Sequence, residues 1–270
     1  MGLRIQNNVE AFNAHRQLNT TAGKAAKAME KLSSGFRINR AADDAAGLAI
    51  SEKMRGQIGG LAQAQRNAQD GISLVQTAEG ALQEVHSMLQ RVRDLKVQYD
   101  NGTLSANDKA AIDSEFVQLK SEISDIRSNT DFNGVKLLDA AGTTTFQVGA
   151  NSGETISVSR IDLTGASGTS GVSSAASLAA VTLTQVDAAI DNVSKARGDF
   201  GAAQNRMEHR LANLGTYQEN LVASESRIRD VDMASEMVNF SKLQILQQAG
   251  TSMLAQANQA AQSVLSLLRG

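Results

Sequence analysis

The chain has 270 residues, of which 41% are hydrophobic but only 3% aromatic, and its formal net charge is −2. It contains no cysteine, which excludes disulfides, thiolate nucleophiles and cysteine-ligated metals, and no proline, so no residue forces a kink or a stop in a helix. This composition favours a mainly α fold, and we find neither the apolar core of a cleaved signal peptide nor a run of about 18 apolar residues that could insert into a membrane.

The first predicted helix is basic and amphipathic and ends at the interruption Ser33-Ser34-Gly35. Because its cations are neither clustered nor interleaved with aromatic residues, they indicate a solvated face and no nucleic-acid contact. Its apolar or small side chains follow alternating steps of four and three residues, and we call them the N-terminal seam. The positions of this seam are Leu18, Ala22, Ala25, Met29, Leu32 and Phe36.

A second helical pattern runs from about 44 to 99, which at ~1.5 Å per residue makes a helix on the order of 80 Å long. Asp43 and Asp44 lie at its start, and without an acid-base partner they favour helix capping over a catalytic pair. The apolar residues on one face of this helix are Ala68, Ile72, Val75, Ala78, Leu82, Val85, Leu89, Val92 and Leu95.

A turn is predicted at Asp100-Asn101-Gly102, and a capping box of Ser105 with Asp108 predicts the start of a third helix. This third helix is expected to end before Asn129. Its apolar face consists of Ile112, Phe116, Leu119, Ile123 and Ile126.

The apolar period changes toward two between 131 and 163, which predicts a small β-hairpin around Asn151-Ser152-Gly153. One face of this hairpin carries Phe146, Val148, Ile156 and Val158. The following residues, 164–180, are rich in Gly, Ser and Ala and predict a flexible or thinly packed connection.

From Thr182, a predicted N-cap with Gln185 as its reciprocal partner, the coiled-coil spacing resumes. Four of the seam positions are polar, which favours a role in setting the register over maximal stability. These positions are Val186, Ile190, Val193, Arg197, Phe200, Gln204, Met207, Leu211, Leu214, Gln218, Leu221, Glu225 and Ile228.

The stretch 243–268 holds no charged residue, which is unusual for a solvated helix. Its apolar or small residues recur at coiled-coil spacing, and its other face is Gln, Asn, Ser and Thr. An isolated helix of this kind is marginal in water, so we infer that it folds when it assembles with a partner surface. The large side chains of this C-terminal seam are Phe240, Leu243, Leu246, Met253, Leu254, Val264, Leu267 and Leu268.

Both ends of the chain are therefore helical, and the two halves are expected to pair antiparallel as a long helical rod or coiled coil with discontinuous domains built from both chain ends. His15, His86 and His209 lie far apart and outside any H-E-x-x-H motif, which favours structural or surface roles over a metal site. No G-x-S-x-G or Walker-type loop occurs. We expect no catalytic residue, no metal and no cofactor.

The chain closely resembles bacterial flagellin, in a minimal form that lacks the inserted outer domains of many relatives. The resemblance spans nearly the whole sequence. The stretches that carry it are KLSSGFRINRAADDAAGLAISEKMRGQI at 31–58, QDGISLVQTAEGALQEVHSMLQRVRDL at 69–95, DFNGVKLLD at 131–139, FQVGANSGETISV at 146–158, ESRIRDVDMASEM at 225–237 and QAGTSMLAQANQAAQSVLSLLR at 248–269.

This resemblance implies a terminal coiled-coil assembly domain made of 1–43 with 229–270, and a helical rod domain over 44–228 with the hairpin at about 131–163. It implies a homopolymer of many copies, the extracellular flagellar filament used for swimming, whose subunits are exported without a cleaved signal peptide. The implied partners are the filament cap, the hook–filament junction proteins, a flagellin export chaperone and the flagellar export apparatus. The uncharged polar face of the C-terminal helix is then expected to line the export channel.

The resemblance also implies recognition by a host Toll-like innate receptor, through residues that match Arg91, Leu95 and Glu115. A second host sensor would read Leu265, Leu267 and Leu268. Phe36 stands where relatives commonly have Leu, a change that packing is expected to absorb. Two alternatives remain open at this point: a hook–filament junction protein, and a chemoreceptor-like signalling coiled coil.

Overall fold

The computed structural model describes the backbone of residues 8–163 and 169–269, and side chains as far as residue 259. The chain forms two compact units, a terminal unit made of 1–56 with 220–270 and a central unit made of 57–219. The family resemblance implies domain boundaries at 43/44 and 228/229 instead. Those two positions lie next to helix ends, because α2 begins at Ala45 and α5 ends at Arg229. The compact units instead divide within these two helices, at 56/57 in α2 and at 219/220 in α5.

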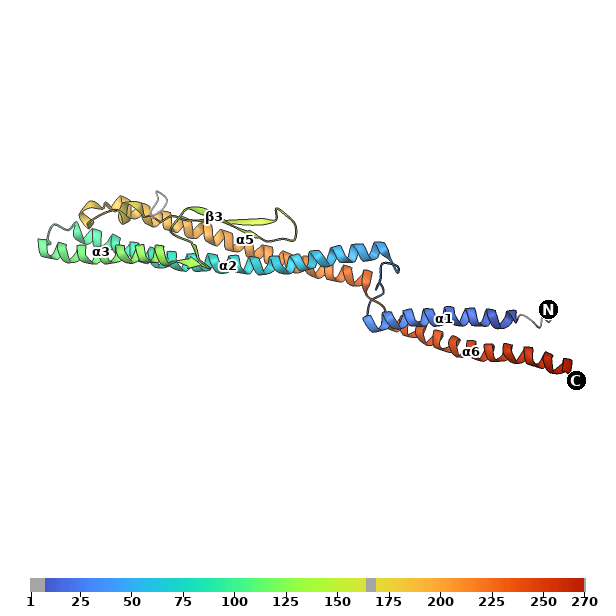
Figure 1. Cartoon of the computed structure of the whole chain (residues 1–270). Coiled ribbons are helices and arrows are strands. Elements are labelled where there is room, and N and C mark those ends of the chain that lie inside the picture. Colours follow the sequence, from blue (N-terminus) through green and yellow to red (C-terminus); the bar gives the residue numbers. More distant parts are fainter. Residues whose placement is uncertain (1–7, 164–168, 270) are drawn as a thin grey trace. The chain divides into compact units, whose positions relative to one another are not determined.

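The described part of the chain is mainly helical, which confirms the predicted fold class (Figure 1). Five helices among the described residues are 24 to 55 residues long, and no proline interrupts them. The helical elements are α1 (Val9–Ser34), α2 (Ala45–Tyr99), α3 (Ala106–Asn129), α4 (Ser170–Ser173), the 3₁₀ turn η1 (Leu178–Ala180), α5 (Leu183–Arg229) and α6 (Met233–Arg269).

Two small antiparallel sheets follow α3. Strands β1 (Asp131–Phe132) and β2 (Val135–Lys136) flank the turn Asn133-Gly134, in which both residues have positive φ. Strands β3 (Gly142–Gln147) and β4 (Thr155–Arg160) form the predicted hairpin. Phe146 lies opposite Ile156, and Val148, Ile156 and Val158 are buried, so the predicted inward face is confirmed.

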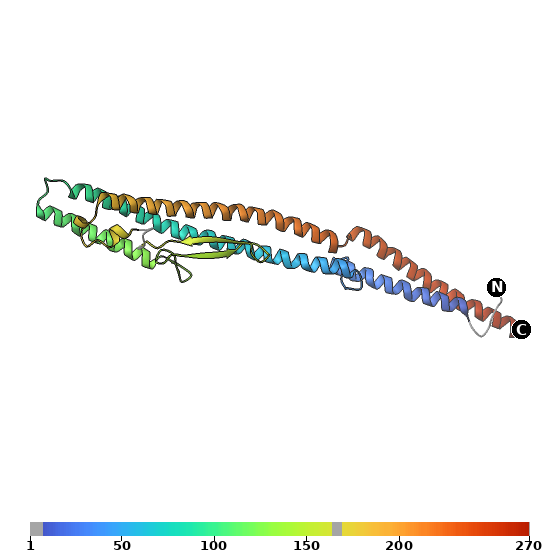
Figure 2. The same ribbon diagram turned by 90° about the horizontal axis from the view of Figure 1, so that it is seen from above.

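The core of the central unit lies between α2, α3 and α5, with the β3–β4 hairpin laid along the helices (Figures 1 and 2). The predicted face of α2 is buried at every position except Ile72, which is half-buried. From α5, Val186, Val193, Phe200 and Met207 are buried against it. The hairpin is fastened by Asn67, whose Nδ2 donates to the carbonyl of Gln147 at 2.9 Å.

Three predicted helix starts are confirmed by their hydrogen bonds. The Ser105 N–H donates to Asp108 Oδ2 at 3.0 Å, and Ser105 Oγ accepts from the Asp108 N–H. The Thr182 N–H donates to Gln185 Oε1 at 2.9 Å, and Thr182 Oγ1 accepts from the Gln185 N–H. Asp44 caps α2 by accepting from the N–H of Gly47 at 2.8 Å. These side-chain oxygens accept hydrogen bonds from N–H groups that a helix start leaves unpaired.

The expectation of a thinly packed connection over 164–180 is corrected for the described residues 169–180. Val172 and Leu178 are buried in the core of the central unit, held by α4 and η1. The N–H of Leu178 donates to Asp113 Oδ1 at 2.6 Å, and the Thr169 hydroxyl donates to the carbonyl of Leu163 at 2.9 Å. These two buried apolar side chains and two hydrogen bonds hold residues 169–180 against the central unit, although the segment contains few large apolar residues.

Candidate assembly interface

Helices α1 and α6 lie side by side in the terminal unit (Figures 1 and 2). Their shared buried cluster is small and consists of Ala25 and Ala28 of α1 with Leu243 of α6, against which Phe240 is partly buried. Further along the pair, Asn8 caps α1 and also donates from Nδ2 to the carbonyl of Ala257 at 2.8 Å. Because small residues dominate the contact, α1 covers only a narrow part of the apolar surface of α6.

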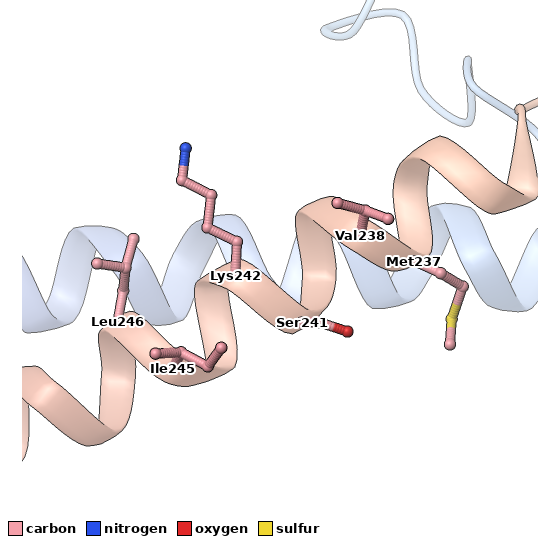
Figure 3. A pocket seen from close by; sticks show the side chains of 6 residues that line it. All are labelled: Met237, Val238, Ser241, Lys242, Ile245 and Leu246. Atoms are coloured by element: carbon pink, nitrogen blue, oxygen red, sulfur yellow. The ribbon is translucent and has the colours of Figure 1, made fainter.

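Much of the remaining apolar surface of α6 is exposed. Val238, Ile245 and Met253 are 73%, 66% and 63% exposed. Several large apolar side chains exposed on one helix are uncommon on the surface of a monomeric protein and often mark an interaction site. Val238 and Ile245 are among the residues that line a groove on α6, whose volume is about 480 Å³; Figure 3 shows the side chains that line it. The groove is lined by Met237, Val238, Ser241, Lys242, Ile245 and Leu246. Such a surface indicates contact with a further protein surface.

Helix α1 also has exposed apolar side chains, since Val9, Phe12 and Met29 are each more than half exposed. In contrast, the uncharged polar face of α6 carries Gln244, Gln247, Gln248 and Thr251, which line a separate depression of about 370 Å³. The terminal unit therefore presents an apolar face and an uncharged polar face on the same helix.

The residues of the predicted C-terminal seam differ in burial. Leu243 is buried against α1, Phe240 and Leu254 are half-buried, and Leu246 and Met253 are exposed. The side chains of Val264, Leu267 and Leu268 lie outside the described residues, as does that of Leu265. Exposure in the single chain leaves Leu246 and Met253 available to another copy, and their role in self-assembly stays a prediction.

The predicted N-terminal seam also divides. Leu18, Leu32 and Phe36 are half-buried, whereas Met29 is exposed and Thr21, Ala25 and Ala28 are buried. The heptad pattern of the sequence therefore locates the helix pair. The contact, however, is centred on the small residues of α1 and not on the large side chains of the predicted seam. Its role in assembly also stays a prediction.

Sequence reasoning missed the exposed apolar row of Val238 and Ile245. These two residues are seven apart and therefore lie on one face of α6, to one side of the seam that contains Leu243. A count of apolar residues at all heptad positions, and not only at the two seam positions, would have revealed this row.

The three residues that match a receptor-binding motif lie in the central unit. Arg91 of α2 donates from Nε to Glu115 Oε1 of α3 at 2.7 Å, and both side chains are about half exposed. This hydrogen bond raises the pKa of the Arg91 guanidinium above its ordinary value. Leu95 is different, because it is 1% exposed and packs in the core. The folded unit therefore presents Arg91 and Glu115 to solvent and uses Leu95 for packing.

Among the described residues, no group of three or more His, Cys, Asp or Glu side chains is placed to hold a metal ion. No helix within the described ranges is both long and apolar enough to cross a membrane.

Comparison with known families decides the kind of protein. Residues 5–143 match the model of the bacterial flagellin N-terminal helical region, and residues 183–268 match that of the bacterial flagellin C-terminal helical region. The chain belongs to the bacterial flagellin family. These two matched regions contain all of α1, α2, α3, α5 and most of α6.

Individual members of the flagellin family align over almost the full chain. A flagellin of Halalkalibacterium halodurans is 54% identical over 98% of this chain and 99% of its own length. A flagellin of Bacillus subtilis is 49% identical over 99% of this chain and all of its own length. The flagellar filament 33 kDa core protein of Treponema phagedenis is 48% identical with similar coverage.

A solved flagellin structure supports the same fold. The crystal structure of Bacillus cereus flagellin is 36% identical, has a TM-score of 0.50, and covers 55% of this chain and 88% of its own. The resemblance inferred from sequence motifs is thus confirmed by family models, full-length relatives and a structure.

Proposed function

We infer that this chain is the repeating structural subunit of a bacterial flagellar filament, an extracellular polymer. The observation that carries the inference is the exposed apolar groove on α6 beside the α1–α6 pair. The groove offers area to further copies, and burial of apolar surface is the main driving force for association. The two alternatives, a hook–filament junction protein and a signalling coiled coil, are not favoured, because the full-length relatives are flagellins and filament core proteins.

In this function the terminal helices do the assembling. The assembly domain consists of 1–43 with 229–270, and the rod domain of 44–228 adds contacts between subunits further out. Leu246 and Met253 are exposed in the single chain and enter the contact between copies. The groove residues Val238 and Ile245 extend this contact.

The partners follow from the same function. The subunit is exported without a cleaved signal peptide by the flagellar export apparatus, with an export chaperone, and is added between the junction proteins and the filament cap. The face made of Gln244, Gln247, Gln248 and Thr251 suits the wall of the export channel. It is wetted but carries no charge, so it neither adsorbs an apolar segment nor traps an ionic one.

Recognition by a host Toll-like receptor is the third part of the proposal. Arg91 and Glu115 are exposed neighbours and form its contact surface, and Leu95 supports α2 beneath them. An arginine at the centre of such a surface is a frequent hot spot of binding.

Seeded polymerisation followed by electron microscopy tests the filament function. Leu246→Glu is expected to abolish growth because assembly would bury an unpaired carboxylate. Gln247→Glu is the matched control: it adds the same charge one residue away on the wetted face and is expected to leave growth nearly unchanged.

A deletion of residues 240–270 provides a second test. The truncated chain is expected to stay a monomer with an intact central unit, whose core contains no residue beyond 219. Filaments formed by the truncated chain, or normal growth of the Leu246→Glu variant, would contradict the proposed function.

A further inference from the structure

Methionine is the only sulfur-containing residue of the chain. The sequence has eight methionines but no cysteine and no tryptophan, so the thioethers are the side chains that an oxidant attacks most readily. Oxidation converts a methionine to its sulfoxide, which turns an apolar side chain into a polar one. The exposure of each methionine therefore decides where an oxidant changes this protein.

The described methionines differ widely in burial. Met207 of α5 is fully buried, and its sulfur lies so close to Gly71 of α2 that a Cβ added there would be 2.8 Å from it. Met237 and Met253 of α6 are instead 51% and 63% exposed. The chain thus holds an enclosed methionine in its central unit and open ones in its last helix.

Met237 and Met253 belong to the apolar surface through which the subunit is proposed to assemble. Met237 lines the groove of α6, and its sulfur is drawn in yellow in Figure 3. Met253 stands seven residues beyond the groove residue Leu246 and so continues the same row along the helix. The exposure of both methionines does not depend on the pairing of α6 with α1, because unfolding of the terminal helices would expose them further.

We propose that oxidation of Met237 and Met253 by a peroxide controls the entry of the subunit into the polymer. The thioether sulfur attacks one oxygen of hydrogen peroxide, the O–O bond breaks, and the proton of the transferred oxygen passes to the displaced hydroxide. One sulfide and one peroxide give one sulfoxide and one water, with the sulfur oxidised and the peroxide reduced. The sulfoxide oxygen accepts hydrogen bonds from water, and an apolar contact between copies offers no donor in their place.

Assembly acts on the same two methionines in the opposite direction. Contact between copies covers them and excludes the oxidant, so the filament protects what the free subunit exposes. Oxidation therefore acts on the subunit before its incorporation and not on the finished polymer. This consequence rests on the proposed function, whereas the difference in reactivity between Met207 and Met253 in the free chain does not.

Peptide mapping by mass spectrometry, after treatment of the full chain with dilute hydrogen peroxide, measures the oxidation of each methionine. In the free subunit, Met237 and Met253 are expected to react at least about tenfold faster than Met207. In filaments of the same chain, their rates are expected to fall to that of Met207. Equal rates in the free subunit, or rates that assembly leaves unchanged, overturn the proposal.

Seeded growth measures the effect of oxidation on assembly. Peroxide-treated subunits are expected to elongate filaments about tenfold more slowly than untreated subunits, because each buried sulfoxide adds an unpaired acceptor. The double variant Met237→Leu, Met253→Leu removes both sulfurs at similar apolar volume and is expected to grow normally and to resist peroxide. The double variant Met29→Leu, Met233→Leu is the matched control. These two methionines are also about half exposed but do not line the groove, so this variant should stay sensitive to peroxide.

Reversal of the modification separates it from other damage. Treated subunits incubated with the two methionine sulfoxide reductases and a thiol reductant are expected to regain growth. Normal growth of treated parent subunits overturns this proposal alone, and so does a Met237→Leu, Met253→Leu variant that is as sensitive as the parent. An untreated parent that forms no filaments would contradict the proposed function as well, so the two failures are distinguishable.

Discussion

Gln65 of α2 donates a hydrogen bond from Nε2 to Oε1 of Gln218 on α5 at 2.9 Å, within an otherwise apolar contact of the central unit. Leu61 and Leu214 are buried nearby on the same two helices. The two amides satisfy each other, and a shift of either helix by one turn would leave one of them unpaired. A single polar pair of this kind specifies register at a modest cost in stability.

Gln218→Ala is expected to lower the free energy of unfolding of the central unit by about 1 kcal/mol, because it leaves the part-buried Gln65 amide without its partner. Urea denaturation measures this change. Gln63→Ala is the control, since Gln63 is exposed on the same helix and bonds only within it. Replacing both Gln65 and Gln218 by Leu is expected to restore stability, and a loss in the double variant larger than in Gln218→Ala would contradict a register role.

The adjacent residues Phe116 and Val117 test which face of α3 packs into the core of the central unit. Phe116 is fully buried between the helices of the central unit, whereas nearly half of Val117 is exposed. Phe116→Ala is expected to cost about 3–5 kcal/mol of stability and Val117→Ala less than about 0.5 kcal/mol. Thermal unfolding followed by circular dichroism measures both. Similar losses in the two variants would show that α3 is packed differently.

The Glu52–Arg229 pair predicts an acid-sensitive step in the terminal unit. The hydrogen bond from Arg229 holds the pKa of the Glu52 carboxyl below its ordinary value. A lowered pKa in the folded chain means that the pair stabilises the fold above the ordinary carboxyl pKa, and that this contribution disappears as pH falls through the lowered pKa. Arg55 also faces Glu52 and contributes in the same direction.

The melting temperature of the terminal helices should therefore fall on acidification, and Glu52→Gln should flatten this dependence. Asp43 and Asp108 also have lowered pKa values, because they accept hydrogen bonds from backbone or hydroxyl groups. Asp108→Asn is thus the useful comparison: it should alter the acid response of the central unit alone. If the melting temperature depended on pH equally in the parent and in Glu52→Gln, the Glu52 carboxylate would not be the source of the acid sensitivity.

Arg91→Ala is expected to weaken activation of the Toll-like receptor about 30-fold in a cell reporter assay, as for a central hot-spot arginine. Arg93→Ala is the matched control. Arg93 lies on the same helix and forms an ion pair of equal length, 2.7 Å, with Asp187 of α5. Equal responses of the two variants would indicate that general charge, and not the Arg91–Glu115 surface, governs recognition.

The sequence by itself determined the elements that depend on local periodicity and capping. The heptad spacing located the long helices, and Ser105, Thr182 and Asp44 were recognisable as caps because their partners lie within three residues. Alternation of apolar residues placed Val148, Ile156 and Val158 on one face of the hairpin. The motifs spread along the chain were also sufficient to indicate the flagellin family.

Only the tertiary structure decided which apolar surfaces are already covered and which are free. The sequence treats Leu243 and Met253 alike, yet the first is buried by α1 and the second is exposed, because the small residues of α1 cover only part of α6. It gave no sign that Arg229 would meet Phe36 and Glu52, which are more than 170 residues away in the chain. Such contacts depend on how distant helix ends meet, and no local pattern encodes that.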